Sequence, residues 1–139
     1  MLIRRFEAGD WADVIDLWRR CGLTRPWNDP EKDIARKQAM QPELFFVGIL
    51  DGAVAATAMA GYDGHRGSVY YLAVDPETQG KGLGRQIMAH VERALEAVGC
   101  PKINVMVRSG NADVAGFYQA VGYEENEVAV YGRRLIADA

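Results

Sequence analysis

A glycine-rich turn between a short apolar strand and a long amphipathic helix constrains this chain most. The turn spans Gln79 to Arg85 and follows the apolar run Val69–Val74. After it, apolar residues recur at helical spacing as far as Gly99, which suits a left-handed helix C-cap. Glycines let the backbone approach a ligand closely, and a helix start offers unpaired N–H groups and a positive dipole end. The sequence therefore predicts an anion-binding turn suited to a pyrophosphate.

Two other phosphate-binding motifs do not fit this turn. A Walker A loop needs Ser or Thr directly after its lysine, but Gly82 follows Lys81. A dinucleotide fingerprint needs a G-x-G-x-x-G spacing in a repeating strand–helix–strand unit, whereas these glycines fall at positions 80, 82 and 84. An NTP-binding protein is thus the weakest interpretation, and a simple tight strand-to-helix connection remains an alternative for the turn alone.

The rest of the chain alternates between strand and helix patterns. Strands are expected at Leu2–Phe6, Leu44–Leu50, Ala53–Ala60, Val69–Val74, Lys102–Val107 and, as a closing strand, Glu127–Leu135. Helices are expected after an Asp10 N-cap and over Glu31–Met40, Leu83–Val98 and Asn111–Ala120. Asp51 and Gly52 form a hairpin turn signal. This order predicts one α+β, or mixed α/β, domain over residues 1–139.

Composition and charge exclude several classes of protein. The formal net charge is -3, so the broad cationic field that nucleic-acid binding needs is missing. Two cysteines are too few for a disulfide framework. The first residues lack the apolar core of a signal peptide, and no apolar run approaches the roughly 20 residues of a membrane span. We therefore expect a cytoplasmic protein that binds neither nucleic acid nor membrane.

A second motif lies downstream of the turn. Asn111 opens a helix that carries Phe117 and Tyr118, and Gly122 and Tyr123 follow it. Together with the turn and its preceding Val-Asp-Pro, this pattern resembles the GNAT superfamily of N-acetyltransferases. The turn matches that family's Gln/Arg-x-x-Gly-x-Gly/Ala motif, and the second segment matches its Asn, Phe-Tyr and Gly-Tyr/Phe signature. The resemblance covers nearly the whole chain. Within the family, the chain is similar to an uncharacterised bacterial subgroup.

This resemblance implies both a fold and an activity. The implied GNAT fold has a central, mostly antiparallel, six- to seven-stranded sheet flanked by about four helices. The implied activity is that of an acyltransferase, an acetyl-CoA-dependent N-acetyltransferase acting on a primary amine of unknown identity by direct attack. Acetyl-CoA is the implied co-substrate, and no metal is required. The acceptor would be a small-molecule or peptide amine, and an exposed closing strand would allow a homodimer.

The resemblance also implies which residues bind acetyl-CoA. The backbone of the turn would hold the pyrophosphate, and the strand before it would pair with the pantetheine arm and offer an N–H to the oxyanion. Asn111 would hydrogen-bond to pantetheine, although a role as helix N-cap explains its identity equally well. The implied cofactor-binding residues are Leu72, Ala73, Val74, Gln79, Gly80, Lys81, Gly82, Leu83, Gly84, Arg85 and Asn111.

Tyr118 is the implied catalytic residue, a general acid that delivers a proton to the departing CoA thiolate. The alternative is a core aromatic, because apolar residues share its helical face. The general base stays open: many relatives carry a glutamate on the strand before the second motif, where this chain has Met106. A water chain that ends on Asp63, His65 or Tyr70 is an alternative route for the proton.

The acceptor site and the retention of activity also stay open. The turn-rich loop 24–30 would offer the ring of Trp27 and the carboxylate of Asp29 to an ammonium group, or Trp27 would simply anchor the loop. The second hypothesis for function is a non-catalytic acyl-CoA-binding sensor or interaction module. Met106 supports that hypothesis, and Tyr118 argues against it.

Overall fold

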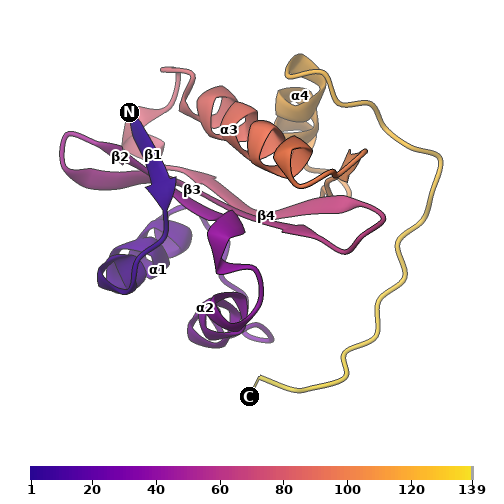
Figure 1. Ribbon diagram of the computed structural model, residues 1–139, viewed down its shortest axis with the longest axis horizontal. Helices are drawn as coiled ribbons and strands as arrows, with labels where there is room; N and C mark the ends of the chain where they lie inside the picture. Colours follow the sequence, from indigo (N-terminus) through magenta and orange to yellow (C-terminus); the bar gives the residue numbers. More distant parts are fainter. Residues whose placement is uncertain (139) are drawn as a thin grey trace.

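A computed structural model describes residues 1–138. Five strands form one sheet in the order β1-β2-β3-β4-β5 (Figure 1). Neighbouring strands run antiparallel, apart from β4 and β5, which are parallel. The strands are β1 (Leu2–Arg5), β2 (Phe45–Leu50), β3 (Ala53–Tyr62), β4 (Gly67–Val74) and β5 (Ile103–Asn104).

Helices cover both faces of the sheet. Figure 1 shows α1 and α2 on one face and α3 and α4 on the other. Because both faces are covered, β2 and β3 are almost continuously apolar and buried. The α-helices are α1 (Trp11–Arg20), α2 (Pro30–Ala39), α3 (Leu83–Ala97) and α4 (Ala112–Ala120), and the short 3-10 helices are η1 (Ala8–Asp10), η2 (Pro42–Leu44) and η3 (Pro76–Thr78). No helix within residues 1–138 is long and apolar enough to cross a membrane.

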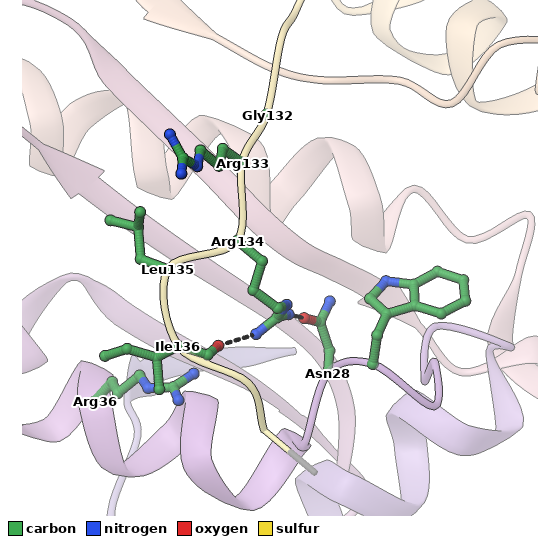
Figure 2. A pocket seen from close by; sticks show the side chains of 8 residues that line it. Asn28, Arg36, Gly132, Arg133, Arg134, Leu135 and Ile136 are labelled. Carbon is green, nitrogen blue, oxygen red and sulfur yellow. Dashed lines mark hydrogen bonds between the residues drawn. The ribbon is translucent and has the colours of Figure 1, made fainter.

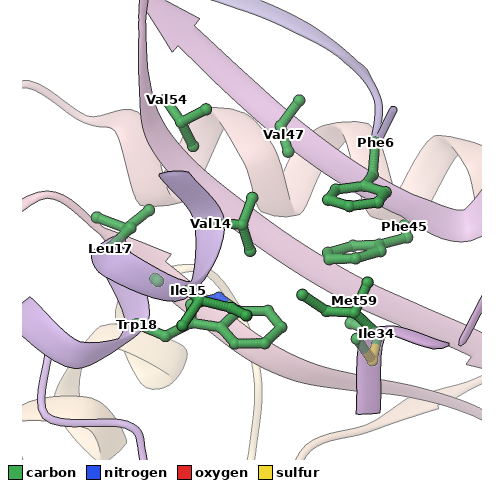
Figure 3. Close-up of a cluster of buried hydrophobic side chains, with 11 residues drawn as sticks. Phe6, Val14, Ile15, Leu17, Trp18, Ile34, Phe45, Val47, Val54 and Met59 are labelled. Carbon is green, nitrogen blue, oxygen red and sulfur yellow. The ribbon is translucent and has the colours of Figure 1, made fainter. Parts of the chain in front are cut away.

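The core between the sheet and α1 is built on aromatic rings (Figure 3). The rings of Phe6 and Phe45 stack with centroids 4.6 Å apart. Val14, Leu17 and Trp18 recur at helical spacing on α1 and are fully buried. Burial of each such side chain contributes about 1.5–3 kcal/mol, so this stripe fixes α1 on the sheet.

A second core lies between the sheet and α3. Its helix side consists of Ile87, Met88, Val91 and Leu95, all buried. Its sheet side includes three alanines of β3, at positions 56, 58 and 60. Such small side chains let the helix lie close to the strands, so the alanine run in β3 matches the bulky stripe on α3.

The predicted mixed α/β class is confirmed, and the expected helices form within a few residues of their predicted ends. Asp10 is the N-cap residue of α1, but its carboxylate does not cap that helix. It accepts a hydrogen bond from the Glu7 N–H at 2.8 Å and pairs with both terminal nitrogens of Arg4, at 2.8 and 2.9 Å. Asp10 therefore joins β1 to the start of α1.

The predicted closing strand over Glu127–Leu135 is wrong, and within residues 1–138 the sheet has five strands rather than six to seven. Residues 127–135 run outside the sheet as an extended tail (Figure 1), and Tyr131 is 95% exposed. The expected strand Lys102–Val107 is also reduced to the two residues of β5. A strand is stabilised by hydrogen bonds to a neighbouring strand, so apolar alternation without a long partner edge does not form one.

Candidate functional site

The glycine-rich turn connects β4 to α3 through the short helix η3. Gly80 and Gly82 have φ angles of +83° and +75°, the left-handed region that favours glycine. A Cβ atom built on either residue would meet nothing within 4 Å. These two glycines are therefore required by backbone conformation, and the space beside them is open to a ligand.

The turn presents the start of α3 to this open space. The first helical hydrogen bond runs from the Gln86 N–H to the Gly82 carbonyl at 3.1 Å, so the N–H groups of residues 83–85 precede the ladder. The side chains of Lys81 and Arg85 are exposed on the same rim, and Arg85 donates to the Ala120 carbonyl at 3.2 Å. Unpaired N–H groups, the helix dipole and two cations together suit an anionic ligand.

Gly84 has a different role from the other two glycines. A Cβ atom at Gly84 would lie 3.0 Å from Cε1 of Phe117, which is closer than ordinary contact. The missing side chain therefore lets Phe117 of α4 pack against the first turn of α3. In this way the turn fixes the position of α4 as well as the N-terminal end of α3.

One edge of β4 is open next to the turn. β4 pairs with β5 only at Gly67 and Ser68, and the rest of its edge on that side has no strand partner among residues 1–138. The pairing with β3 shifts register at a bulge, where Tyr71 has a φ angle of +51°. The backbone of residues 72–74 therefore lies on a free edge, which suits an extended ligand that pairs like a strand.

Tyr118 of α4 reaches the same region. It is 7% exposed and packs in the cluster that also holds Leu72 and Val74. Tyr123 donates a hydrogen bond to Glu92 at 2.9 Å, whereas the Tyr118 hydroxyl makes no side-chain hydrogen bond within residues 1–138. Burial raises the pKa of Tyr118 to about 12, so the phenol carries its proton at neutral pH.

Asn111 occupies the N-cap position of α4. Its Oδ1 accepts a hydrogen bond from the Val114 N–H at 3.2 Å, so the capping role is real. A side-chain amide has two further N–H donors that this cap does not use. Asn111 can therefore cap the helix and still donate to a ligand.

A hollow of about 500 Å³ lies on the α2 side of the molecule (Figure 2). Its lining comes from the loop before α2, from Arg36 and from the tail, and consists of Trp27, Asn28, Arg36, Gly132, Arg133, Arg134, Leu135 and Ile136. The ring of Trp27 lines this hollow. Asp29 is not among the lining residues, and its carboxylate caps α2 by accepting from the Glu31 N–H at 2.9 Å.

Asp138 fixes the tail beside this hollow. Its side chain is 1% exposed and accepts hydrogen bonds from Arg36 at 2.6 Å and from the Asp29 N–H at 2.8 Å. Lys32 donates to the Asp138 carbonyl at 2.6 Å, and Arg134 bonds to Asn28. The hydrogen bond from Arg36 is the largest cause that lowers the pKa of Asp138, to about 2. The tail is thus attached to α2 at neutral pH.

Comparison with known proteins identifies the family. The model of the acetyltransferase (GNAT) family matches residues 11–123. The chain belongs to the GNAT family. The residues matched include the glycine-rich turn, the open edge of β4 and Tyr118, whereas the tail that borders the hollow lies beyond them.

Individual relatives agree with this family. An acetyltransferase of Yersinia enterocolitica is 49% identical over 138 residues, which are 99% of this chain and 98% of the relative. The ribosomal-protein-S18-alanine N-acetyltransferase of Escherichia coli superposes with a TM-score of 0.75 at 28% identity, over 90% of this chain and 78% of that one. An aminoglycoside N-acetyltransferase solved in complex with CoA has the same fold, with a TM-score of 0.77 at 20% identity over 97% and 95% of the two chains. The predicted family and enzyme class, N-acetyltransferase, are confirmed.

Two candidate bases of this GNAT protein, Asp63 and His65, lie together in the turn between β3 and β4, and Tyr70 lies on β4. Asp63 accepts hydrogen bonds from the backbone N–H groups of His65 and Arg66, at 2.8 and 2.7 Å, and these bonds lower its pKa. It therefore holds the turn between β3 and β4, at the end of β4 away from the glycine-rich turn. Tyr70 is 47% exposed, and Met106 is 55% exposed with no group that takes up a proton.

The sequence did not identify Tyr71 and Asp33 as site residues. The Tyr71 hydroxyl donates to Oδ2 of Asp33 at 2.6 Å, although the two residues are 38 positions apart. No glycine or proline in the sequence marks the bulge that turns Tyr71 toward α2. No local pattern in the sequence could have paired these side chains.

Proposed function

We propose that this GNAT protein transfers the acetyl group of acetyl-CoA to a primary amine by direct attack. The observation that carries the proposal is that β4, whose free edge leads into the open turn before α3, packs its Leu72 and Val74 in the same cluster as Tyr118. The pyrophosphate would be held by the backbone of Gln79–Arg85, and the pantetheine arm by Leu72, Val74 and Asn111. Bound acetyl-CoA would supply an activated acyl thioester.

The chain's own groups then have defined tasks. A backbone N–H near Ala73 stabilises the negative charge that develops on the acetyl oxygen. Tyr118 holds a proton at its hydroxyl oxygen and gives it to the CoA sulfur as the thiolate leaves. Cys21 of the neighbouring helix end donates its thiol hydrogen to the Val74 carbonyl of β4 at 3.3 Å, and burial raises the pKa of this thiol. A protonated thiol is a poor nucleophile, which supports direct attack over a covalent enzyme intermediate.

Calorimetric titration with acetyl-CoA tests the binding part of the proposal. Wild-type protein should bind, and Gly82→Glu should not, because its carboxylate faces the pyrophosphate site. Gly82→Asn is the matched control, because asparagine tolerates a positive φ angle without adding charge. It should keep most of the binding. If neither the wild type nor the control binds, the proposed function is wrong.

An amine panel tests turnover. Release of the CoA thiol should be measured with a peptide that begins with alanine, with lysine, with spermidine and with an aminoglycoside. The first and last follow from the names of the two structural neighbours, which act on a ribosomal protein and on aminoglycosides. Binding of acetyl-CoA without thiol release from any amine would favour the alternative, a non-catalytic acyl-CoA-binding sensor or interaction module.

Location and assembly belong to the same proposal. We expect a cytoplasmic, metal-independent protein that consists of one domain and binds neither nucleic acid nor membrane. The expected homodimer can no longer rest on a closing strand. It rests instead on the apolar side chains that the tail exposes, namely Val128, Val130, Tyr131, Leu135 and Ile136. Light scattering at two concentrations would measure the oligomeric state.

A further inference from the structure

Tyr71 has an unusual backbone conformation for its place in the fold. Three residues other than glycine have positive φ angles within residues 1–138: Gln41, Asp51 and Tyr71. Gln41 precedes a 3-10 helix and Asp51 lies in a hairpin turn, but Tyr71 lies inside β4. A bulky residue persists in this region only when its surroundings hold it there, and such positions cluster at functional sites.

Three elements hold Tyr71 in place. Its ring stacks on Trp18 of α1, with centroids 3.7 Å apart and planes at 10°. Its carbonyl accepts a hydrogen bond at 2.8 Å from Thr57 of β3, and the Thr57 oxygen in turn accepts from Nε1 of Trp18 at 2.9 Å. Its hydroxyl donates to Asp33 of α2 at 2.6 Å. The Tyr71 hydroxyl and the Asp33 carboxylate are therefore fixed relative to the backbone of β4.

The pair lies on the opposite face of the sheet from Tyr118. Tyr71 packs with the cluster under α1, whereas Leu72 and Tyr118 pack with the cluster under α3. No strand flanks β4 at residues 72–74 on its free edge, so side chains on both faces of the sheet can reach a ligand there. Asp33 also contacts Arg36 at 3.2 Å, and Arg36 lines the hollow on the α2 side. The pair is thus linked through Arg36 to the lining of that hollow.

We propose that Tyr71 and Asp33 form the proton acceptor for the attacking amine. This assignment rests on the proposed function and fills the role for which Met106 has no suitable group. Because its own hydrogen points to Asp33, the Tyr71 oxygen has lone pairs free to accept a hydrogen bond from an amine N–H. Burial and the neighbouring carboxylate raise the pKa of Tyr71, so it works as a neutral relay and not as a phenolate.

The proton balance of the step is complete. The amine nitrogen forms a bond to the acetyl carbon, and the carbonyl electrons move to the acetyl oxygen. An N–H proton passes to the Tyr71 oxygen while the hydroxyl proton of Tyr71 passes to Asp33. The carbon–sulfur bond then breaks, and Tyr118 gives its proton to the sulfur. Water carries the proton from Asp33 back to Tyr118, so the products are the amide and the free CoA thiol.

Two substitutions separate this role from a structural one. Tyr71→Phe keeps the stacking on Trp18 and removes the relay. Asp33→Asn can still accept the Tyr71 hydrogen bond through its amide oxygen but cannot take up a proton. With the fastest amine of the panel, both variants should lower kcat at least about 100-fold, because general base catalysis contributes about 100- to 10,000-fold. Their affinity for acetyl-CoA in calorimetry should stay within about twofold of the wild type.

Two variants are matched controls. Tyr62→Phe removes a hydroxyl that is directed at the Gly99 carbonyl, and Asp13→Asn changes a carboxylate on the exposed side of α1. Both should keep wild-type kcat. A kcat for Asp33→Asn within about threefold of wild type, in a folded protein that binds acetyl-CoA, would overturn the assignment alone. Absence of turnover by the wild type would overturn the proposed function and this assignment with it.

Discussion

Thr57 is a buried polar residue inside an apolar strand. Its side chain is fully buried, accepts the Trp18 indole hydrogen and donates to the Tyr71 carbonyl. Each group finds a partner, so burial of the hydroxyl is not penalised. The same hydroxyl joins α1 to the bulge of β4, and it therefore links the stability of the core to the shape of the site.

Replacement of Thr57 by valine should destabilise the protein. Valine has nearly the same shape but leaves the Trp18 N–H without a partner in the core, which costs about 1–3 kcal/mol. Denaturant unfolding measures the change, and Thr57→Ser, which keeps the hydroxyl, is the control. If the valine variant unfolds at the same denaturant concentration as the wild type, the hydrogen bonds of the Thr57 hydroxyl contribute no net stability.

Tyr118→Phe should lower kcat by about 100- to 10,000-fold, because the variant has no proton to give to the thiolate. Its fold should be intact, since the hydroxyl makes no side-chain hydrogen bond within residues 1–138. Steady-state kinetics at saturating acetyl-CoA measures the effect. Tyr123→Phe is the matched control: it loses the bond to Glu92, so it should lose about 0.5–1.5 kcal/mol of stability and keep its kcat. Equal rates for both variants would remove Tyr118 from the mechanism.

Local sequence predicts the residues whose role depends on their own neighbours along the chain. Gly80 and Gly82 were predicted from the glycine-rich pattern before a helix, and both have the positive φ angles that favour glycine. The pair of Tyr71 and Asp33 was missed, since it depends on a bulge and on how α2 packs against β4. Asp29, which the sequence offered to an ammonium group, caps α2 in the structure, because a carboxylate before a helix accepts from the first N–H groups.

At the scale of elements, the N-terminus of α4 tests whether one residue has two tasks. Asn111→Ala removes the cap and should cost about 1 kcal/mol of stability, whereas Asn111→Ser keeps a capping oxygen and should be nearly neutral. If the Asn111 amide also binds pantetheine, both variants should weaken acetyl-CoA binding in calorimetry. Wild-type affinity in the serine variant would restrict Asn111 to capping.

The elements that local pattern predicts well are those that are stable through their own periodicity and packing. The stripes of α1 and α3 bury a full face each, and the hairpin at Asp51 and Gly52 fixes β2 against β3. The closing strand failed because its existence depends on a partner edge. β5 provides only two paired residues, and the alternation after Glu127 carries no information about that length.

At the scale of the whole molecule, the sheet separates two sets of groups. Alternate residues of β4 face opposite sides: Tyr71 and Ala73 pack toward α1, and Leu72 and Val74 pack toward α3. The groups proposed for the thioester lie on the α3 side, and the hollow and the tail lie on the α2 side. With the sites proposed above, two substrates would enter from different directions and meet at the free edge of β4.

The tail completes the α2 side, and Asp138 attaches it. Asp138→Asn should weaken the bonds to Arg36 and to the Asp29 N–H, so the tail should detach more often. Because Arg133 and Arg134 are exposed, trypsin at neutral pH should then cut the variant there faster than the wild type. Asp113→Asn, on an exposed turn of α4, is the control. Equal cleavage rates for Asp138→Asn and the wild type would show that Asp138 does not hold the tail.

Acid should detach the tail through the same carboxylate. The pKa of Asp138 is about 2 in the folded protein, below its ordinary value of 3.8, because Arg36 and the Asp29 N–H stabilise the charged form. A lowered pKa means that the contribution to stability is complete above about pH 4 and is lost as the pH falls toward 2. The NMR chemical shifts of residues 132–138 should therefore move toward random-coil values across that window in the wild type. In Asp138→Asn these shifts should lie near random-coil values already at neutral pH, and their change between pH 4 and 2 should be smaller.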